Sequence, residues 1–229
     1  MILYRPTDGD VHTSPIQWRP RTCFVMAQLG PPIPPKLQDA RSDFEQVLDR
    51  FDYKQIDADA VTTGQDFLLK IWGLTISVPV GIAFVHEGIN SKTLANIFYE
   101  LGMMQVYGKE ILIIKVGDAD IPSDFVRTEY VSYDGHFDRR ISTFFSRLEE
   151  RAEYYLTLAD QLERNPLLAI DYVRRAYLLS GDNALITEAQ RIFNEAGLAD
   201  RAKNSVEQLL LSFCHPFRER GRTRRKPST

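Results

Sequence analysis

The chain lacks the features that mark several large classes of protein. Its 229 residues include two cysteines, Cys23 and Cys214, and neither belongs to a CxxC or Cys/His cluster, which argues against structural zinc. No uncharged apolar run is long enough to span a bilayer, and the first residues show no apolar leader, so we expect no membrane partner. Two isolated cysteines favour a reducing compartment, and we expect a cytoplasmic protein.

The chain also lacks a large excess of charge of either sign, except at its C-terminal end. The formal net charge is −3, which predicts no general attraction to nucleic acid. The last residues, RERGRTRRKPST, carry six basic side chains against Glu219. Such a tail can touch nucleic acid or an acidic partner, but a nucleic-acid enzyme also carries basic residues on its folded face. We therefore expect a disordered, solubilising tail and no nucleic-acid partner.

What is present is a regular alternation of buried strands and amphipathic helices. Continuous apolar runs bounded by polar loops are typical of parallel strands covered on both faces. The pattern predicts an α/β fold, flavodoxin- or Rossmann-like, with a mostly parallel sheet of four to five strands and helices on both faces. The predicted strands lie at 22–29, 53–61, 78–85, 110–116 and 129–134. The predicted helices lie at 36–51, within 62–77, and at 94–107 with Ser91 as N-cap and Gly108 as C-cap.

The pattern becomes purely helical from about residue 137, which suggests a division of the chain. Helices of similar length joined by short Gly or Asn turns form antiparallel hairpins. They are similar to tetratricopeptide-type pairs, although the repeat signature is degraded. We predict four segments: an extended arm at 1–20, an α/β domain at 21–136, a C-terminal all-helical hairpin region at 137–215 and a basic tail at 216–229.

The helix predicted at 94–107 carries the main chemical candidate. Asn96 and Glu100 are four residues apart and so share a helix face, and Met103 projects to the same side. In parallel sheets ligands bind beyond the carboxyl ends of the strands, where this helix begins. Helical side chains point back toward the helix N-terminus, so Glu100 can reach that crevice. The alternative is a solvated acid on a surface helix.

The stretch NSKTLANIFYELGMMQVYGKEILIIK, residues 90–115, resembles a segment of nucleoside 2-deoxyribosyltransferases and of related TIR-like domains of bacterial defence systems. In those families the glutamate before Leu-Gly is catalytic, and it matches Glu100. The following Gly-Lys and apolar strand strengthen the match. The resemblance covers roughly residues 22–134 and is sharpest over 90–115.

The resemblance implies cleavage of an N-glycosidic bond. The transferases cleave deoxynucleosides, and the TIR-like enzymes cleave the nicotinamide–ribose bond of NAD, which is then a substrate rather than a cofactor. Glu100 would stabilise or trap the ribosyl cation, and Asn96 or Tyr99 would orient it or bond a ribose hydroxyl. Both families act as assemblies, so a homo-oligomer is implied. The expected partner is a nucleotide or nucleoside.

Further candidates lie in the loops after the predicted strands. Gln28 and Gly30 would contact ribose or phosphate, and the helix starting near Pro35 would offer free N–H groups to phosphate. Asp57 would touch a ligand hydroxyl; Asp57 and Asp59 resemble a metal pair, but a third ligand is missing, so no metal is expected. Neither a GxGxxG nor a P-loop is present, which argues against dinucleotide oxidoreductases and NTPases.

The loop HEGINSKT departs from the family pattern, which has an acid and a Gly-Thr step there. Glu87 would supply the acid, and Ser91 is a weak counterpart of a family serine. His86 is either a base or substrate contact, or a strand-end histidine bonded to the backbone. Two other functions stay open: a non-catalytic nucleotide sensor whose helical tail mediates assembly, and a structural protein that binds partners through its hairpins.

Overall fold

The computed structural model describes residues 4–5, 7–10, 12, 16–58, 67–125, 130–162 and 164–197. Its centre is one five-stranded sheet with all neighbouring strands parallel, in the order β2-β1-β3-β4-β5. This is the flavodoxin-type order, in which the chain reverses its direction of winding between β1 and β3. The α/β prediction is confirmed. The strands are β1 Thr22–Met26, β2 Lys54–Ile56, β3 Val80–His86, β4 Glu110–Val116 and β5 Tyr130–Ser132.

Six α-helices and a short 3-10 helix lie in the described part of the chain. They are α1 Pro35–Arg50, α2 Phe67–Ser77, α3 Ser91–Val106, η1 Ser123–Phe125, α4 Phe137–Asp160, α5 Pro166–Ser180 and α6 Ala184–Glu195. The second strand is shorter than predicted. The part of the predicted hairpin region after residue 197, the basic tail, Cys214 and Asp59 fall outside the described residues.

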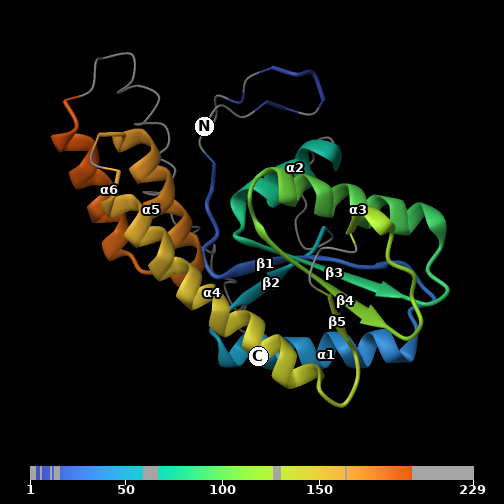
Figure 1. Cartoon of the computed structure of the whole chain (residues 1–229). Coiled ribbons are helices and arrows are strands. Elements are labelled where there is room, and N and C mark those ends of the chain that lie inside the picture. The colour runs from blue at the N-terminus through green and yellow to red at the C-terminus, as the bar shows by residue number, and fades with distance from the viewer. Residues whose placement is uncertain are drawn as a thin grey trace, which may run out of the picture.

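Helices cover both faces of the sheet (Figure 1). On one face, α1 and α4 bury Phe44 and Phe145 against alternate residues of the central strands, such as Phe84. On the other face, α2 and α3 bury Ile71 and Leu101 against the intervening residues of the same strands, whose side chains point to that face. Both faces of β3 are therefore apolar and buried, which is why its sequence reads as a continuous apolar run.

The first helix of the C-terminal region shares a core with the sheet. The ring of Phe145 on α4 lies 6.2 Å from Phe44, 5.5 Å from Phe51 and 5.0 Å from Tyr53, measured between centroids. From there α5 packs on α4 and α6 packs on α5 (Figure 1). The predicted boundary near residue 136 thus falls within a continuous set of packed side chains.

Both ends of α3 have identifiable capping residues. The side chain of Asn90 accepts a hydrogen bond of 2.8 Å from the Thr93 N–H, so Asn90 is the N-cap and the prediction of Ser91 was wrong by one residue. Ser91 is instead the first helical residue and is exposed. Gly108 has a φ of +64° and follows the C-cap Tyr107, a position that favours glycine because it has no Cβ.

Of the helices in the described part of the chain, none combines the length and the apolar character that crossing a bilayer requires.

Candidate functional site

Two predicted site residues meet at the carboxyl edge of the sheet. Gln28 follows β1 and His86 ends β3, and these strands flank the point where the winding reverses. His86 Nε2 lies 2.9 Å from Gln28 Oε1. Ligands of open α/β sheets bind at this point, so the pair occupies the expected place for a site.

The Gln28 side chain also holds the loop that follows β1. Its amide nitrogen donates to the carbonyl oxygens of Gly30 and Pro32, at 2.8 Å each. The other ring nitrogen of His86, Nδ1, lies 2.7 Å from the carbonyl oxygen of Glu87. His86 is buried. Its contact with the Glu87 carbonyl fits the second of the two predicted alternatives, a strand-end histidine bonded to the backbone. Both side chains therefore organise the loops around the crevice.

Glu87 belongs to the same edge but faces the end of β4. Its carboxylate accepts a hydrogen bond of 3.3 Å from the Asp118 N–H. A Cβ placed on Gly117, whose φ is +69°, would lie 2.9 Å from the Glu87 carboxyl carbon. Glycine is thus needed at position 117 for both its backbone conformation and the approach of Glu87.

The predicted phosphate site at the start of α1 lacks the donors it needs. Pro34 is the N-cap and Pro35 the first helical residue, and neither has an N–H. The Leu37 N–H bonds the Pro34 carbonyl oxygen at 2.9 Å. Lys36 is the one residue left in the first turn with an N–H to offer, so the row of free donors that was predicted is not there.

Asp57, after β2, lies 3.6 Å from Arg41 of α1.

Glu100 is a largely buried carboxyl on α3. It is the tenth residue of the helix, about 14 Å from its start at 1.5 Å per residue. Within the described residues it has neither a hydrogen-bond nor an ion-pair partner, and loss of solvent raises its pKa from 4.5 to about 7. The alternative of a solvated surface acid does not fit this burial. Perturbed carboxyls of this kind are candidates for functional groups.

The other predicted residues of α3 are placed differently from Glu100. Asn96 is exposed, and the described residues include no hydrogen bond between it and Glu100. Tyr99 is 53% exposed and faces outward. Met103 is half-buried and packs against the core under α2 and α3. Their predicted roles at the substrate stay predictions.

The Gly-Lys step of the family-like segment has a structural role in this chain. Lys109 Nζ donates a hydrogen bond of 2.8 Å to the carbonyl oxygen of Ile76, near the end of α2. It thereby satisfies a carbonyl that the last helical turn leaves unpaired. The step connects the ends of two helices at the amino edge of the sheet, opposite the carboxyl edge where Gln28 and His86 meet.

Sequence reasoning missed two residues of the carboxyl edge, Arg41 and Asp118. Asp118 had a usable signal, because the Gly-Asp pair directly follows the buried strand β4. Arg41 had none, since its approach to Asp57 depends on how α1 packs beside β2. Within the described part of the chain, no three or more His, Cys, Asp or Glu side chains gather as ligands for a metal ion.

No protein-family model matches the chain, and a search of the curated proteins found no match.

The raised pKa of Glu100 predicts a pH-dependent cost to stability. Below pH 4.5 the carboxyl is protonated in both the folded and the unfolded chain, so it costs nothing. As pH rises from 4.5 to about 7, the unfolded chain loses the proton first, so the free energy of unfolding falls. Above pH 7 the cost is complete, on the order of 3 kcal/mol. Glu100→Gln should remove it.

Chemical denaturation at pH 5 and pH 8 measures this effect. The difference in the free energy of unfolding between Glu100→Gln and the parent chain should be more favourable to the variant at pH 8 than at pH 5. Glu150→Gln, at an exposed acid of α4, controls for the loss of one negative charge. If the free energy of unfolding changed with pH by the same amount in Glu100→Gln and Glu150→Gln, Glu100 would not be desolvated.

Proposed function

We propose that this chain cleaves the N-glycosidic bond of a nucleotide or nucleoside, with Glu100 as the catalytic carboxylate. The observation that carries the proposal is the burial of Glu100 without a described partner, on the helix that follows the β3 end of the switch point. The resemblance of residues 90–115 to glycoside-cleaving families supports the same assignment.

The chemistry suits a single carboxylate. As the C1′–N bond breaks, its electron pair leaves with the base and positive charge develops on the ribose ring. Glu100 stabilises that charge, or bonds C1′ as an ester that water later opens, with the water proton leaving to solvent. Either role requires the ionised form of Glu100.

NAD is the substrate we favour. Its nicotinamide ring is a cation while bonded to ribose and leaves as a neutral molecule, so no proton donor is needed. A cation near Glu100 also favours the ionised carboxyl, which opposes the effect of burial on its pKa.

The test is incubation with NAD and with a panel of nucleosides, followed by chromatography of the released base. Because the free enzyme must have Glu100 ionised, kcat/KM should rise roughly tenfold between pH 6 and pH 8, with a midpoint near 7. A profile that is flat across this range would contradict the role of Glu100, and no release of any base would contradict the proposed reaction.

The pairing of Gln28 with His86 favours a second candidate, a nucleotide sensor. Each of these side chains is occupied by hydrogen bonds within the protein, so they are suited to hold a loop in place rather than to react. Binding of NAD or a nucleotide without release of base would support this function.

We also propose that the active form is a homo-oligomer in the cytoplasm. Tyr99 and Val106 are 53% and 84% exposed on α3, where an apolar contact with another copy would cover them. Cys23 is a free, buried thiol, which is compatible with a reducing compartment.

A further inference from the structure

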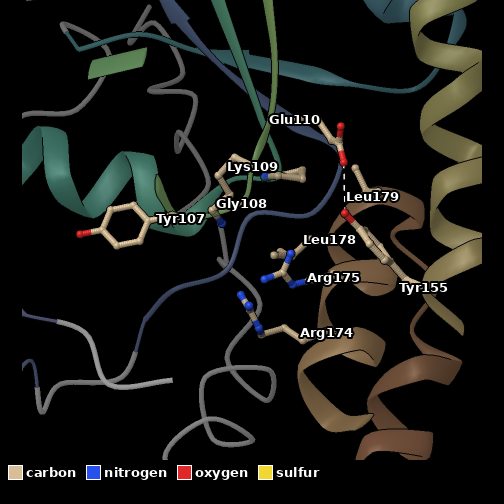
Figure 2. Close-up of a pocket in the computed structure, with 10 residues that line it drawn as sticks. Tyr107, Gly108, Lys109, Glu110, Tyr155, Arg174, Arg175, Leu178 and Leu179 are labelled. Atoms are coloured by element: carbon tan, nitrogen blue, oxygen red, sulfur yellow. Dashed lines mark hydrogen bonds between the residues drawn. The ribbon is translucent and has the colours of Figure 1, made fainter. Parts of the chain in front are cut away.

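A small cavity lies at the amino edge of the sheet, far from the carboxyl edge described above (Figure 2). It forms where the end of α3 and the start of β4 meet α4 and α5. Its volume is about 20 Å³, and it is partly open to solvent. Lys109, Arg174 and Arg175 line it together with Glu110 and Tyr155. Three basic residues thus line one opening.

The two arginines share a single carboxylate. Arg174 donates from Nε and Nη2 to Asp171 Oδ1, at 3.2 and 2.6 Å, and Arg175 donates from Nε to Oδ2 at 3.0 Å. Asp171 therefore offers one negative charge for two positive ones. Arg174 is 3% exposed, so its charge is largely removed from water. The Trp18 ring, whose centroid lies 4.6 Å from the Arg174 guanidinium carbon, offsets part of the cost of burying this charge.

The second acid of the cavity does not restore the balance. Glu110 accepts a hydrogen bond of 3.1 Å from the Tyr155 hydroxyl and lies 3.4 Å from Arg151 Nε. Arg151 adds a further positive charge beside Glu110 but does not line the cavity. The charged residues that line the cavity are therefore Lys109, Arg174 and Arg175 against Glu110, and Asp171 is bonded to both arginines.

Helix ends do not account for the extra cations. The last carbonyls of α5 are bonded by other groups: Leu178 by the Arg21 N–H at 2.8 Å, Leu179 by the Tyr53 hydroxyl at 2.8 Å and Ser180 by Arg21 Nη1 at 3.1 Å. The guanidinium groups of Arg174 and Arg175 point instead toward the cavity (Figure 2).

Lys109 is affected by the same imbalance. Burial lowers its pKa well below the usual value, and the positive charges of Arg174 and Arg175 lower it further. An anion in the cavity would offset that repulsion. The missing Cβ of Gly108 keeps the opening clear, because a Cβ there would lie 3.0 Å from Arg175 Nη1.

We propose that this cavity binds an anion, and specifically a terminal phosphate group. The size of the cavity admits one or two phosphate oxygens and leaves the rest of a ligand outside. Guanidinium groups match phosphate through paired N–H donors, and an ammonium adds a compact charge. The group is either free phosphate or the phosphate end of a larger molecule such as a nucleotide.

Titration of the full chain with inorganic phosphate and with AMP, followed by calorimetry at constant ionic strength, tests this site. The expected result is saturable binding of phosphate at or below about 1 mM. Binding of AMP at equal or higher affinity would identify a phosphomonoester as the ligand, and weaker binding would identify free phosphate. Absence of phosphate binding up to about 10 mM overturns the proposal.

Arg175→Gln removes a cavity charge and should weaken phosphate binding at least tenfold. Arg151→Gln is the matched control: it removes a cation of the same joint that does not line the cavity, and should change binding less than threefold. Equal effects of the two changes would show non-specific attraction and would overturn the site. Should Arg175→Gln fail to fold, Arg175→Lys keeps the charge but loses the planar donors; unchanged phosphate affinity in that variant would contradict recognition by the guanidinium.

Discussion

Replacing Glu100 with glutamine should lower turnover of the N-glycosidic substrate by at least about 100-fold, the scale on which loss of one electrostatic stabiliser acts. Glutamine has nearly the same shape as glutamate, so packing beneath α3 should be kept. It cannot carry the negative charge that the ribosyl cation requires. The loss should appear in kcat more than in KM, because the charge on the sugar develops in the transition state.

Two further variants separate chemistry from damage to the fold. Glu100→Asp keeps the charge but shortens the side chain, so it should retain part of the activity. Glu150→Gln removes an exposed acid from α4 and should leave turnover unchanged. If Glu100→Gln kept full activity, the catalytic assignment would be wrong whatever the substrate.

The second large effect concerns the joint between the sheet and the C-terminal helices. Phe145→Ala should lower the free energy of unfolding by about 3–5 kcal/mol. Phe145 is fully buried and packs against Phe44, Phe51 and Tyr53, so its removal leaves a cavity lined by rings from separate elements. Leu167→Ala, at a half-exposed residue of α5, is the control and should cost far less.

The same experiment tests whether the predicted domains unfold separately. Since α4 shares a core with α1 and the sheet, one cooperative transition is expected from both far-UV circular dichroism and tyrosine and tryptophan fluorescence. Two separate transitions, with Phe145→Ala shifting one of them alone, would support the predicted boundary near residue 136.

The sheet was the most predictable part of the molecule. Runs such as VPVGIAFV and EILIIKV are apolar throughout because helices cover both sides of the strands, and this pattern is visible without a structure. Their alternation with helices fixed the parallel arrangement. The order of the strands was open, because the sequence does not say on which side of β1 each connection passes.

The candidate site was predictable in position but not in detail. The strand-end rule located Gln28, His86 and Glu87, yet their partners depend on distances across the sheet. Gln28 and His86 are 58 residues apart in sequence and bond each other. The burial of Glu100 depends on the packing of α3, and periodicity alone left the solvated alternative open.

The amino-edge cavity was even less predictable from the sequence than the candidate site. Adjacent basic residues such as Arg174 and Arg175 read as the polar face of a helix. Their convergence with Lys109 depends on α5 packing where α3 ends, and no local pattern marks that contact. In the sequence, the lysine of the Gly-Lys step is visible only as part of a family-like segment.

The most direct test of the account is whether the purified chain releases free base from its substrate. NAD incubated with the parent protein at pH 8 and at high protein concentration should yield nicotinamide, detected by chromatography, and the Glu100→Gln protein should yield none above background. The concentration matters because an assembled form is proposed. Equal release by both proteins, or no release of nicotinamide or any nucleoside base by the parent protein in its assembled state, would contradict it.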